Sequence, residues 1–508
     1  MDARDKIVKL EELPELLKEH RKAGQKVILC HGVFDLLHPG HIKHIEAAKK
    51  NGDILVVTIT PDEYVNKGPH RPVFDELYRA ETIGALEKVN YVAINKWPSA
   101  VHTIELLTPD IYVKGSDYKN PDEDITGEIA NENKAIAKVG GRIIYTDEET
   151  FSSSKIINEN LHLISDEAKK FISGLKNRYS QGEILGTLNS LQDLKVTIVG
   201  EAIIDEYIYG DTIGKSSKDP HLVLRQKNIE IHLGGSLAIA NQVAEFCGDV
   251  TLVTYLGDRE SYEELIKEKL NPDIITKFIY KTDSPTIVKK RIIDDYFFHK
   301  LIEIYTINDE DLSKKQEKEL IEILDAQLDE SDAVLVCDYG HGLISENTIN
   351  SLSKTKTHLA VNVQSNAGNF GYNFISKYPR AELVTVDESE LRLENRNKFG
   401  DVEDLLENVY EKMDYGQIIV TRGANGSSAF SRETGHIKAP ALAGNIVDRM
   451  GAGDTFFSLS SLLSARGVPL EIVSFIGNAV GALAVKIVGN KEPITKISLK
   501  KTLISLLK

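Results

Sequence analysis

Short, continuous apolar runs alternate with stretches of helical spacing over the first third of the chain. The runs with the character of buried strands lie at 26–30, 53–60, 91–94, 111–115 and 142–145. Between them, 40–50 and 75–87 repeat apolar residues at helical spacing. Strands that are apolar throughout and alternate with helices predict a parallel, doubly wound α/β sheet.

A second alternating pattern begins at Leu194. Its expected strands lie at 194–199, 250–255, 333–337, 359–363, 383–386 and 417–421. A β-rich segment at about 208–231 interrupts it early, and we expect the apolar run 286–293 to pair with that segment as a small β lid. The polar, helix-compatible segment between the two patterns predicts a connector. We therefore predict domains at 1–165 and 194–508, joined by a connector at 166–193.

Length and composition agree with two globular domains. A chain of 508 residues with 41% apolar and 27% charged residues is too long for one core. No run approaches the roughly eighteen apolar residues that span a bilayer, and the charged N-terminus precedes no apolar segment, so we expect no membrane segment and no secretory signal. Three unpaired cysteines in apolar segments are typical of reduced thiols in a cytoplasmic protein: Cys30, Cys247 and Cys337.

The formal net charge of −16 restricts the partners of the chain. Nucleic-acid phosphates favour a basic protein face, so we expect no nucleic-acid partner. Anionic small substrates would need sites that concentrate Lys, Arg, His and helix N-termini against this overall field.

The tetrapeptide His38-Pro39-Gly40-His41 lies where the first predicted strand turns into a helix. Gly40 lets the backbone approach a phosphate closely, and the helix N-terminus presents free N–H groups and a positive dipole end. Both imidazoles can then donate to the charge that builds on an α-phosphate under attack. Two histidines around a Pro-Gly step also occur as simple turn chemistry. The strand before and the helix after favour phosphate binding.

The run His31-Gly32-Val33-Phe34-Asp35 before this tetrapeptide resembles the cytidylyltransferase-like nucleotidyltransferases. Residues 25–160 are similar to the nucleotidyltransferase half of the bifunctional heptose-phosphate kinase/adenylyltransferases. By that resemblance, Asp35 orients a site group or a metal-bound water, Asp117 contacts substrate, and the serines serve as a second phosphate turn rather than a helix cap. The residues implied to bind nucleotide or phosphate are Val33, Phe34, Gly40, Lys43 or Lys67, Arg79, Ser152, Ser153 and Ser154.

A second glycine motif, Gly451-Ala452-Gly453, precedes Asp454 and a long apolar helix. Its successive backbone N–H groups can form an anion hole for a γ-phosphoryl group in transfer. Asp454 follows at once, where it can accept a proton from an attacking hydroxyl. The motif predicts a phosphoryl-transfer site with Asp454 as its base.

Residues 194–498 resemble the ribokinase-like (PfkB) carbohydrate kinases, on this motif and on Asn478 within Gly477–Ala482. The resemblance implies that Asp205 binds sugar hydroxyls and that Asn478 serves the nucleotide side. It also implies that four further positions contact the substrate and that two acidic residues bind magnesium. Those substrate positions are Gly234, Gly235, Lys289 and Arg291, of which the last two could instead form the outer face of a lid strand; the acidic positions are Asp387 and Glu390.

The sequence departs from the kinase pattern at three places. Ala238 stands where the family has an Asn after the diglycine, and Asp387 replaces the Asn of its N-x-x-E motif. Where the heptose kinases have Asp-Pro-Lys, this chain has Asn362-Val363-Gln364. The domain order is also the reverse of the familiar heptose enzyme, whose kinase comes first. These departures leave the sugar and the metal affinity open.

The two sites together predict a bifunctional enzyme that uses Mg²⁺, ATP and sugar phosphates. One domain would phosphorylate a sugar or sugar phosphate, and the other would transfer a nucleotidyl group from ATP or CTP to a sugar 1-phosphate. The alternative is an active nucleotidyltransferase attached to a kinase-like domain that only binds a ligand or acts as a scaffold. A homodimer is the expected assembly, because it is the commonest symmetric oligomer.

Overall fold

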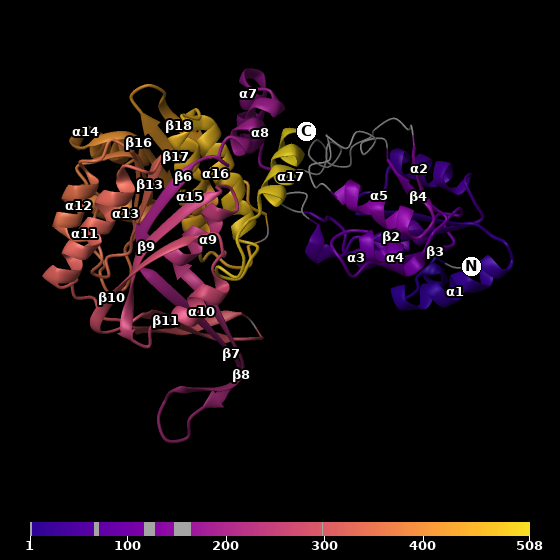
Figure 1. Ribbon diagram of the computed structural model, residues 1–508, viewed down its shortest axis with the longest axis horizontal. Coiled ribbons are helices and arrows are strands. Elements are labelled where there is room, and N and C mark those ends of the chain that lie inside the picture. The colour runs from indigo at the N-terminus through magenta and orange to yellow at the C-terminus, as the bar shows by residue number, and fades with distance from the viewer. Residues whose placement is uncertain (1–2, 66–70, 116–127, 147–163, 297, 445) are drawn as a thin grey trace. The chain divides into compact units, whose positions relative to one another are not determined.

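The computed structural model describes residues 3–65, 71–115, 128–146, 164–296, 298–444 and 446–508. The chain forms two compact units (Figure 1), one of residues 1–166 and 500–508 and the other of residues 167–499. Each unit is built on its own sheet.

The first unit contains a five-stranded, fully parallel sheet of order β3-β2-β1-β4-β5. Its strands are β1 Val27–Gly32, β2 Ile54–Ile59, β3 Tyr91–Ile94, β4 Ile111–Lys114 and β5 Arg142–Tyr145. Its helices are α1 Leu13–Lys22, α2 Pro39–Lys49, α3 Glu76–Gly84, α4 Val101–Leu107 and α5 Glu128–Lys138. Alternate residues of β1 enter two separate buried clusters, Val27 and Leu29 in one and Ile28 and Cys30 in the other. Both faces are therefore covered, which confirms the doubly wound prediction.

Strand order in this sheet reverses between β1 and β4, because the chain leaves β1 toward β2 and later returns to the other side of β1. In open α/β sheets, ligands bind outside the carboxyl ends of the strands at such a switch point. Helix α2 begins at this edge with Pro39. The fold therefore brings the His38–His41 turn to the favoured ligand position.

The second unit is built on a nine-stranded sheet of order β10-β9-β6-β13-β14-β15-β16-β17-β18. Its strands are β6 Lys195–Gly200, β9 Asp249–Arg259, β10 Ile275–Pro285, β13 Ala333–Asp338, β14 His358–Val363, β15 Arg380–Asp387, β16 Asp414–Thr421, β17 Ser427–Ser431 and β18 Gly435–Ala439. Neighbours from β10 to β16 are parallel, and β17 and β18 add antiparallel at one edge. The parallel α/β prediction is confirmed for this unit also.

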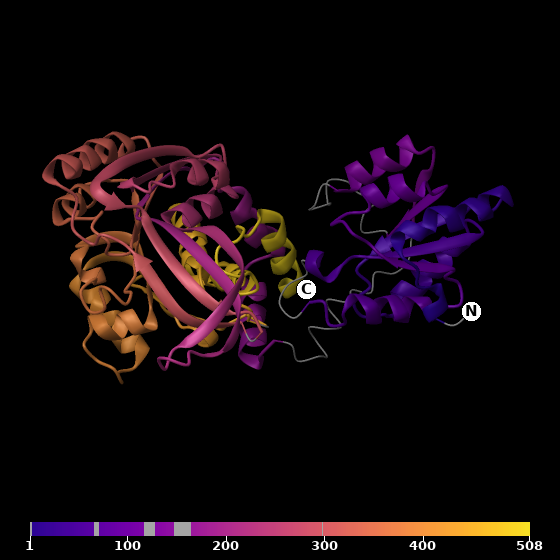
Figure 2. The same ribbon diagram turned by 90° about the horizontal axis from the view of Figure 1, so that it is seen from below.

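Helices flank this sheet (Figure 2). They are α9 Ser236–Ala244, α10 Glu263–Lys269, α11 Lys314–Leu328, α12 Glu346–Leu352, α13 Glu388–Glu394, α14 Val402–Lys412, α15 Ala452–Ala465 and α16 Leu470–Ala484. The last helix, α17 Lys496–Leu507, belongs mostly to the first unit, which includes residues 500–508. Helices α15 and α16 are buried along most of their length, which explains why they are apolar on all sides. Among the described residues, no helix combines the length and the apolar character that crossing a bilayer requires.

A separate four-stranded sheet, in the order β12-β11-β7-β8, forms the predicted lid. Its strands are β7 Ala202–Lys215, β8 Leu222–Gly235, β11 Ile287–Asp294 and β12 His299–Thr306. Strand β11 pairs in parallel with β7, so the run at 286–293 does join the β-rich segment. Strand β12 was not predicted, because it is exposed over most of its length and lacks a buried apolar run.

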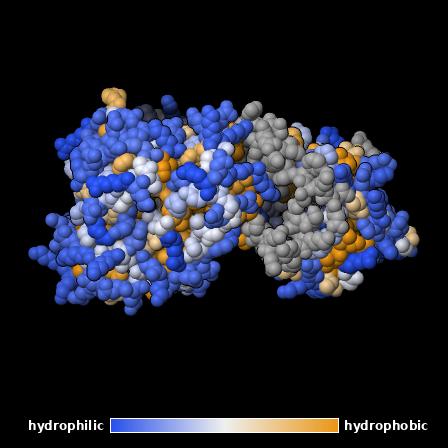
Figure 3. Space-filling view, turned by 90° about the horizontal axis from the view of Figure 1, so that it is seen from above, coloured by the Kyte–Doolittle hydropathy of each residue, from blue (hydrophilic) through white to orange (hydrophobic). Residues whose placement is uncertain are grey.

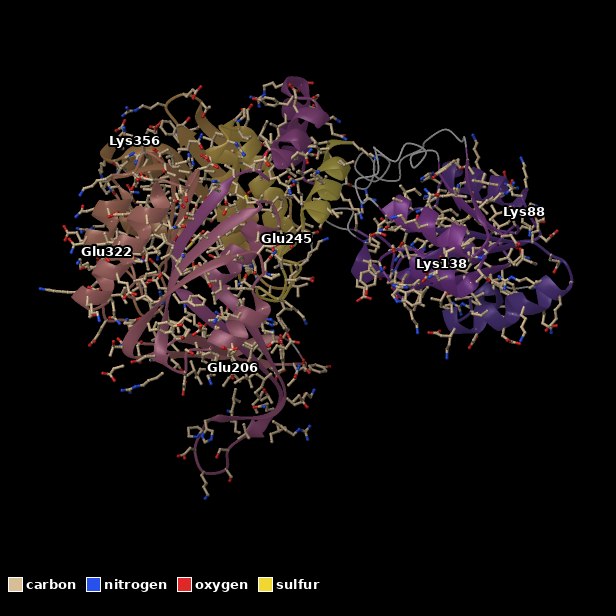
Figure 4. All side chains as sticks on the ribbon, viewed as in Figure 1. Lys88, Lys138, Glu206, Glu245, Glu322 and Lys356 are labelled. Carbon is tan, nitrogen blue, oxygen red and sulfur yellow. The ribbon has the colours of Figure 1, made fainter. Side chains whose placement is uncertain are left out.

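The face in Figure 3 is mostly hydrophilic over the second unit, with isolated apolar residues. Lys88, Lys138, Glu322 and Lys356 are exposed and extend outward from their helices and loops (Figure 4). Scattered apolar residues on such a surface are ordinary for a globular protein.

The segment predicted as a connector forms two helices, α7 Asp166–Arg178 and α8 Gln181–Asn189. Helix α7 and Tyr179, which follows it, contact α16 of the second unit. The rings of Phe171 and Phe475 have centroids 6.5 Å apart, and the Glu471 carboxylate accepts bonds from Arg178 at 2.7 Å and from Tyr179 Oη at 2.6 Å. The packing indicates that 167–189 belongs with the second unit.

We therefore expect a fragment of residues 166–508 to unfold at a higher temperature than one of residues 191–508. The shorter fragment loses the buried faces of α7 and α8, including Ile172, Leu175 and Leu188, each worth about 1.5–3 kcal/mol when fully buried. Calorimetric unfolding of both fragments measures the difference. Equal midpoints would show that the two helices add nothing to this unit.

Candidate active sites

The His38–His41 turn brings two imidazoles together at the N-terminus of α2. The Nδ1 atom of His38, the N-cap residue, accepts a hydrogen bond from the backbone N–H of Gly40 at 3.1 Å. The ring of His41 stacks on that of His38 with centroids 3.9 Å apart, and the ring of Phe34 meets His41 at 5.3 Å. A neutral His38 that accepts at Nδ1 carries its proton on Nε2. The predicted residues Phe34, His38, Gly40 and His41 thus form one cluster.

Arg79 holds the backbone just before this turn. The resemblance had implied that this residue binds the triphosphate. The Arg79 side chain has no exposed surface. Its guanidinium donates to the carbonyls of Val33 at 2.5 Å and Thr60 at 2.9 Å and to Asp62 Oδ1 at 2.5 Å, and its Nε donates to Phe74 O at 2.9 Å. All of these acceptors are protein oxygens. The structure therefore corrects that assignment: Arg79 fixes the loop of Val33 and the start of α3.

Asp35 has a similar structural role. Its carboxylate accepts hydrogen bonds from Arg71 at 3.2 Å and from the backbone N–H groups of Val73 at 2.6 Å and Phe74 at 3.3 Å. The residue is almost fully buried. It fastens two loops together, which differs from the expected contact with a site group or a metal-bound water.

Lys114, at the carboxyl end of β4, was not a candidate in the sequence. It is buried and forms an ion pair with Glu132 at 2.8 Å. Burial, reinforced by the charge of Lys114, lowers the pKa of His31 to about 3 and that of His44 to about 4. His31 and His44 are therefore neutral at physiological pH, with Nδ1 atoms within 2.9 Å of Thr58 Oγ1 and 3.0 Å of Thr146 Oγ1. The sequence feature that could have identified Lys114 is a lysine at the end of a buried parallel strand.

The remaining predicted residues of this unit are less informative. Lys43 is exposed on α2, in the turn that follows His41. Lys67, Asp117, Ser152, Ser153 and Ser154 lie outside the described residues.

In the second unit, Gly451 and Asp454 lie at the start of α15. Gly451 is the N-cap, with a φ of 77°, and a side chain there would overlap the side chain of Asn490. Ala452 and Gly453 are the first residues of this 14-residue helix. The N-terminus of such a helix presents unpaired N–H groups and a positive dipole end to an anion. The geometry fits the predicted anion hole.

Asp448, three residues before this glycine turn, holds the turn in place. Its Oδ1 accepts from Lys300 at 2.7 Å and from Met450 N at 3.2 Å, and its Oδ2 accepts from Gly489 N at 3.1 Å. The lid and the glycine turn are therefore joined through one buried carboxylate.

Asp454 lies within the first turn of α15. Its Oδ1 accepts hydrogen bonds from Gln364 Nε2 at 2.5 Å and Tyr339 Oη at 3.1 Å. Burial raises the pKa of this carboxyl to about 6, the two hydrogen bonds oppose the rise, Asp205 adds to it and Lys289 opposes it. A carboxylate with a pKa near the working pH is well suited to act as a general base.

The lid contributes Asp205, Lys289 and Arg291 from paired strands. Asp205 on β7 lies opposite Lys289 on β11, and Arg291 Nη1 donates to Asp205 Oδ1 at 2.5 Å. Arg291 also contacts Glu303 at 2.8 Å, whereas no described carboxylate lies within ion-pair distance of Lys289. Burial lowers the pKa of Lys289. Lys289 is thus a buried lid cation with no ion-pair partner among the described residues.

The diglycine allows Asp205 to sit close to α9. A side chain at Gly234 would overlap the Asp205 carboxylate, and Gly235, with a φ of 56°, is the N-cap of α9. The structure therefore brings the predicted substrate positions together at one end of the lid.

A cavity of about 190 Å³ opens beside Asp454. It is lined from α15 by Asp454, Thr455 and Ser458, and from β8 and α9 by His232, Ala238 and Asn241, among others. Asn241, the nearest Asn to the family position, is bonded to the backbone of Lys269 and Asn271. The short side chain of Ala238 thus leaves room where the kinase pattern has an Asn.

The two acidic residues suggested for magnesium cap α13. Asp387 Oδ1 accepts from Ser389 N at 2.8 Å, and Glu390 accepts from Asp387 N at 2.8 Å and Ser365 N at 2.7 Å. Burial raises the pKa of Glu390 to about 7. In the part of the chain that the structure describes, no three His, Cys, Asp or Glu side chains are grouped to hold a metal ion. The pair fits Mg²⁺ held mainly by nucleotide phosphates and water.

Asn478, on α16, was assigned to the nucleotide side. Its amide nitrogen donates to the carbonyls of Ala439 at 2.9 Å and Pro440 at 3.1 Å. The side chain therefore fixes the backbone that leaves β18. The amide N–H groups of Asn478 can therefore contribute to nucleotide binding only through this backbone.

Comparison with known families agrees with the resemblance predicted for each of the two regions. Residues 193–497 match the pfkB family carbohydrate kinases, and residues 29–159 match the cytidylyltransferase-like family. The nucleotidyltransferase-like region therefore precedes the kinase region, as the motifs predict.

Among curated relatives, the bifunctional protein HldE of Desulfatibacillum aliphaticivorans is 39% identical over 157 residues, which cover 30% of this chain and 31% of the relative. The bifunctional protein HldE of Helicobacter pylori (strain Shi470) is 38% identical over 154 residues, 30% of each chain. The chain thus matches these relatives over about a third of their length.

Two solved structures share the fold of the second unit. Phosphofructokinase-2 from Escherichia coli in complex with potassium superposes with a TM-score of 0.51 at 16% identity, covering 62% of this chain and 100% of that chain. A putative ribokinase from Agrobacterium tumefaciens gives a TM-score of 0.50 at 17% identity, covering 61% and 98%. At these identities the similarity concerns the fold alone.

Proposed function

The chain belongs to the pfkB family of carbohydrate kinases, and because a cytidylyltransferase-like domain precedes its kinase domain, we propose that it is a bifunctional enzyme of nucleotide-activated sugar synthesis. The second unit phosphorylates a sugar or sugar phosphate, of a class similar to heptose 7-phosphate, with ATP. The first unit joins a sugar 1-phosphate to a nucleotidyl group from ATP or CTP and releases pyrophosphate. We propose that both steps occur in the cytoplasm.

The position of Asp454 is the observation that best supports phosphoryl transfer by the second unit. It lies within one helical turn of the Gly451–Gly453 amides and borders a cavity. In the proposed step, Asp454 takes the proton of the substrate hydroxyl while the hydroxyl oxygen bonds to the γ-phosphorus. The bond from that phosphorus to the β–γ bridging oxygen breaks, and ADP leaves. The amides of the glycine turn stabilise the charge on the phosphoryl oxygens.

Mg²⁺, when bound with ATP, would neutralise the phosphates, and Asp387 and Glu390 are the residues of this chain that would hold it. Asp387 is exposed and available to a water shell, whereas Glu390 lies deeper. Asp205 would bind a sugar hydroxyl, with its carboxylate oriented by Arg291.

In the nucleotidyltransferase half, a phosphate oxygen of the sugar 1-phosphate attacks the α-phosphorus of the NTP, and the bond to the bridging oxygen of pyrophosphate breaks. His38 and His41 lie at a helix N-terminus, where donors and the dipole favour the anionic transition state. Their stacked arrangement supports a shared role on the same phosphate. The product of the kinase, if its phosphate is anomeric, is the nucleophile of this step.

Lys289→Met should weaken binding of a phosphorylated sugar far more than binding of its unphosphorylated counterpart. Methionine keeps the length of the stem, but it loses a buried cation whose hydrogen bonds to a charged group are worth about 1.5–3 kcal/mol. We expect KM for the sugar phosphate to rise about ten- to hundredfold with KM for ATP unchanged. An equal rise for both sugars would exclude Lys289 as the phosphate contact. Lys290→Met, on the same strand and paired with Glu206, is the matched control.

The proposal as a whole is tested by incubating the purified chain with ATP, CTP and Mg²⁺ and a panel of sugars and sugar phosphates, with products read by mass spectrometry. We expect ADP and a phosphorylated sugar in one reaction, and pyrophosphate and a nucleotide sugar in another. Pyrophosphate release without ADP formation for any sugar would favour the scaffold alternative, to which the changes at Ala238 and Gln364 already point.

A further inference from the structure

Two donors from neighbouring strands meet on one oxygen of Asp454. Tyr339 directly follows β13, and Gln364 directly follows β14, the strand paired with β13. Both donate to Oδ1, Gln364 through Nε2 at 2.5 Å and Tyr339 through its hydroxyl at 3.1 Å. Among the described residues, no hydrogen bond reaches Oδ2. The two oxygens of this carboxylate are therefore in different environments.

The tyrosine is held in place by a buried support. Its backbone N–H donates to Glu201 Oε2 at 3.0 Å, and its carbonyl accepts from Asn366 Nδ2 at 2.9 Å and Asn369 Nδ2 at 2.7 Å. Glu201 has no exposed surface. The Tyr339 backbone is therefore fixed on both sides.

The glutamine is held in a comparable way. Its backbone N–H donates to Asp338 O at 2.9 Å, and its Nε2 also donates to Asn362 Oδ1 at 3.1 Å. Asn362 in turn donates through Nδ2 to the carbonyl and hydroxyl of Thr385, at 2.9 and 3.0 Å. Gln364 therefore approaches Asp454 as part of a chain of hydrogen bonds across β14 and β15. Such chains restrict rotamers and polarise each bond.

We propose that Tyr339 and Gln364 are positioning residues for the catalytic base: they hold Oδ1 of Asp454 and leave Oδ2 to accept the substrate proton. This inference rests on the proposed kinase function. Holding one oxygen fixes the plane of the carboxylate, so Oδ2 has a defined direction at the edge of the cavity. Loss of such a constraint can cost about a hundredfold in rate when reacting atoms move by about 1 Å.

The neutral amide of Gln364 also has an electrostatic consequence. Asp205 on β7 raises the pKa of Asp454, Lys289 on β11 lowers it, and the charge of Asp454 raises the pKa of its neighbours Cys337, Tyr339 and Glu390. A lysine at 364, as in the Asp-Pro-Lys of the heptose kinases, would add a cation and lower the pKa of the base further. Glutamine supplies a directed donor without that charge. It orients Asp454 and leaves its basicity near the working pH.

Substitutions at 364 should therefore move the acid limb of the kcat–pH profile in opposite directions. A base is active only when deprotonated, so activity is lost as pH falls through its pKa. Gln364→Met removes a donor that stabilises the carboxylate and should shift the limb to higher pH, and Tyr339→Phe should do the same. Gln364→Lys should shift it to lower pH. We expect kcat at neutral pH to fall about ten- to hundredfold for Gln364→Met, with KM for ATP unchanged.

Matched controls separate positioning from stability. Tyr415→Phe removes a buried hydroxyl that donates to Ile375 O at 2.9 Å and Tyr378 O at 3.0 Å. Gln316→Met removes an amide that donates to Tyr280 O at 2.5 Å. Neither residue contacts Asp454. Both controls should lower thermal stability and leave the acid limb where it is.

The pKa of Asp454 can be titrated in the full-length protein without any catalytic turnover. This measurement tests the positioning role separately from the proposed kinase function. With aspartate labelled by ¹³C at the side-chain carboxyl, the Asp454 signal is the one missing in Asp454→Asn, and its pKa is read directly by NMR. We expect this pKa to rise in Gln364→Met and Tyr339→Phe and to fall in Gln364→Lys. These shifts without ADP formation from any sugar would show that both residues hold the Asp454 carboxylate, and they would overturn the kinase proposal and with it the catalytic part of the inference. An unchanged Asp454 pKa in all three variants, with ADP still formed, would overturn the positioning role alone.

Discussion

Asp454→Asn should slow phosphoryl transfer by about a hundred- to ten-thousandfold, because an amide of the same size cannot accept the proton of the attacking hydroxyl. ATP binding should survive, since the anion hole consists of backbone N–H groups of Gly451–Gly453 that the substitution leaves in place. Nucleotidyl transfer to a supplied sugar 1-phosphate should proceed at the normal rate. Calorimetry with ATP and a coupled ADP assay on the same preparation measure both quantities.

The control for this variant is Asp325→Asn, an equivalent change on α11 at a carboxylate that contacts Ser351. It should leave ADP formation unchanged. Wild-type ADP formation by Asp454→Asn would remove Asp454 from the role of base. Loss of ATP binding would show that the carboxylate, and not the glycine turn alone, shapes the nucleotide site.

The pH dependence follows from the same residue. Burial raises the pKa of Asp454 to about 6, and the base works in its deprotonated form. Kinase activity is therefore expected to be full well above that value and to fall as pH decreases through it.

His41→Ala should slow pyrophosphate release by about a hundred- to a thousandfold and leave the kinase step unchanged. Removal of one preorganised donor to a developing oxyanion has an effect of this size. The substitution also removes the ring that stacks on His38 at 3.9 Å. A coupled pyrophosphate assay, with the kinase assay run on the same protein, measures the effect.

His41→Phe separates the two contributions. Phenylalanine keeps an aromatic ring between His38 and Phe34 but has no donor, so we expect a loss close to that of His41→Ala. His20→Ala, a histidine on α1 that contacts Gln25 and Tyr91, is the control in the same unit and should be fully active. If His41→Phe were as active as the unmodified chain, stacking rather than donation would be the role of His41.

The fold and the turns that carry the chemistry could be predicted because their signals are local. Continuous apolar runs marked the parallel strands, and glycine, proline and histidine marked the strand-to-helix turns at their carboxyl ends. In parallel α/β sheets those ends converge on one edge, so the location of Gly40 followed from topology. Gly451 was identified by its motif alone, since the preceding strand, β18, is antiparallel and ends at Ala439. The pairing of 286–293 with the lid was expected, but the predicted lid segment, 208–231, begins after Asp205, so the position of Asp205 opposite Lys289 was not predicted.

What could not be predicted depends on contacts between distant residues. Tyr339 and Gln364 are 115 and 90 positions from Asp454 in sequence, and neither carries a motif that indicates a hydrogen bond to it. For Arg79, in contrast, the sequence suggested a contact that the structure does not favour. An arginine on a helix near a phosphate motif suggests a ligand contact, but its donors are used by Val33, Thr60 and Asp62. Only the packed structure decides between a ligand and a protein acceptor.

The central claim is that one chain makes a sugar phosphate and then activates it. It is tested most directly by mass spectrometry of the nucleotide sugar formed when the full chain receives ATP, CTP, Mg²⁺ and a sugar that has no anomeric phosphate. We expect the nucleotide sugar to form with the unmodified chain, to be absent with Asp454→Asn, and to return when the sugar 1-phosphate is supplied to that variant. Equal nucleotide-sugar formation by the unmodified chain and by Asp454→Asn from the same unphosphorylated sugar would contradict the account.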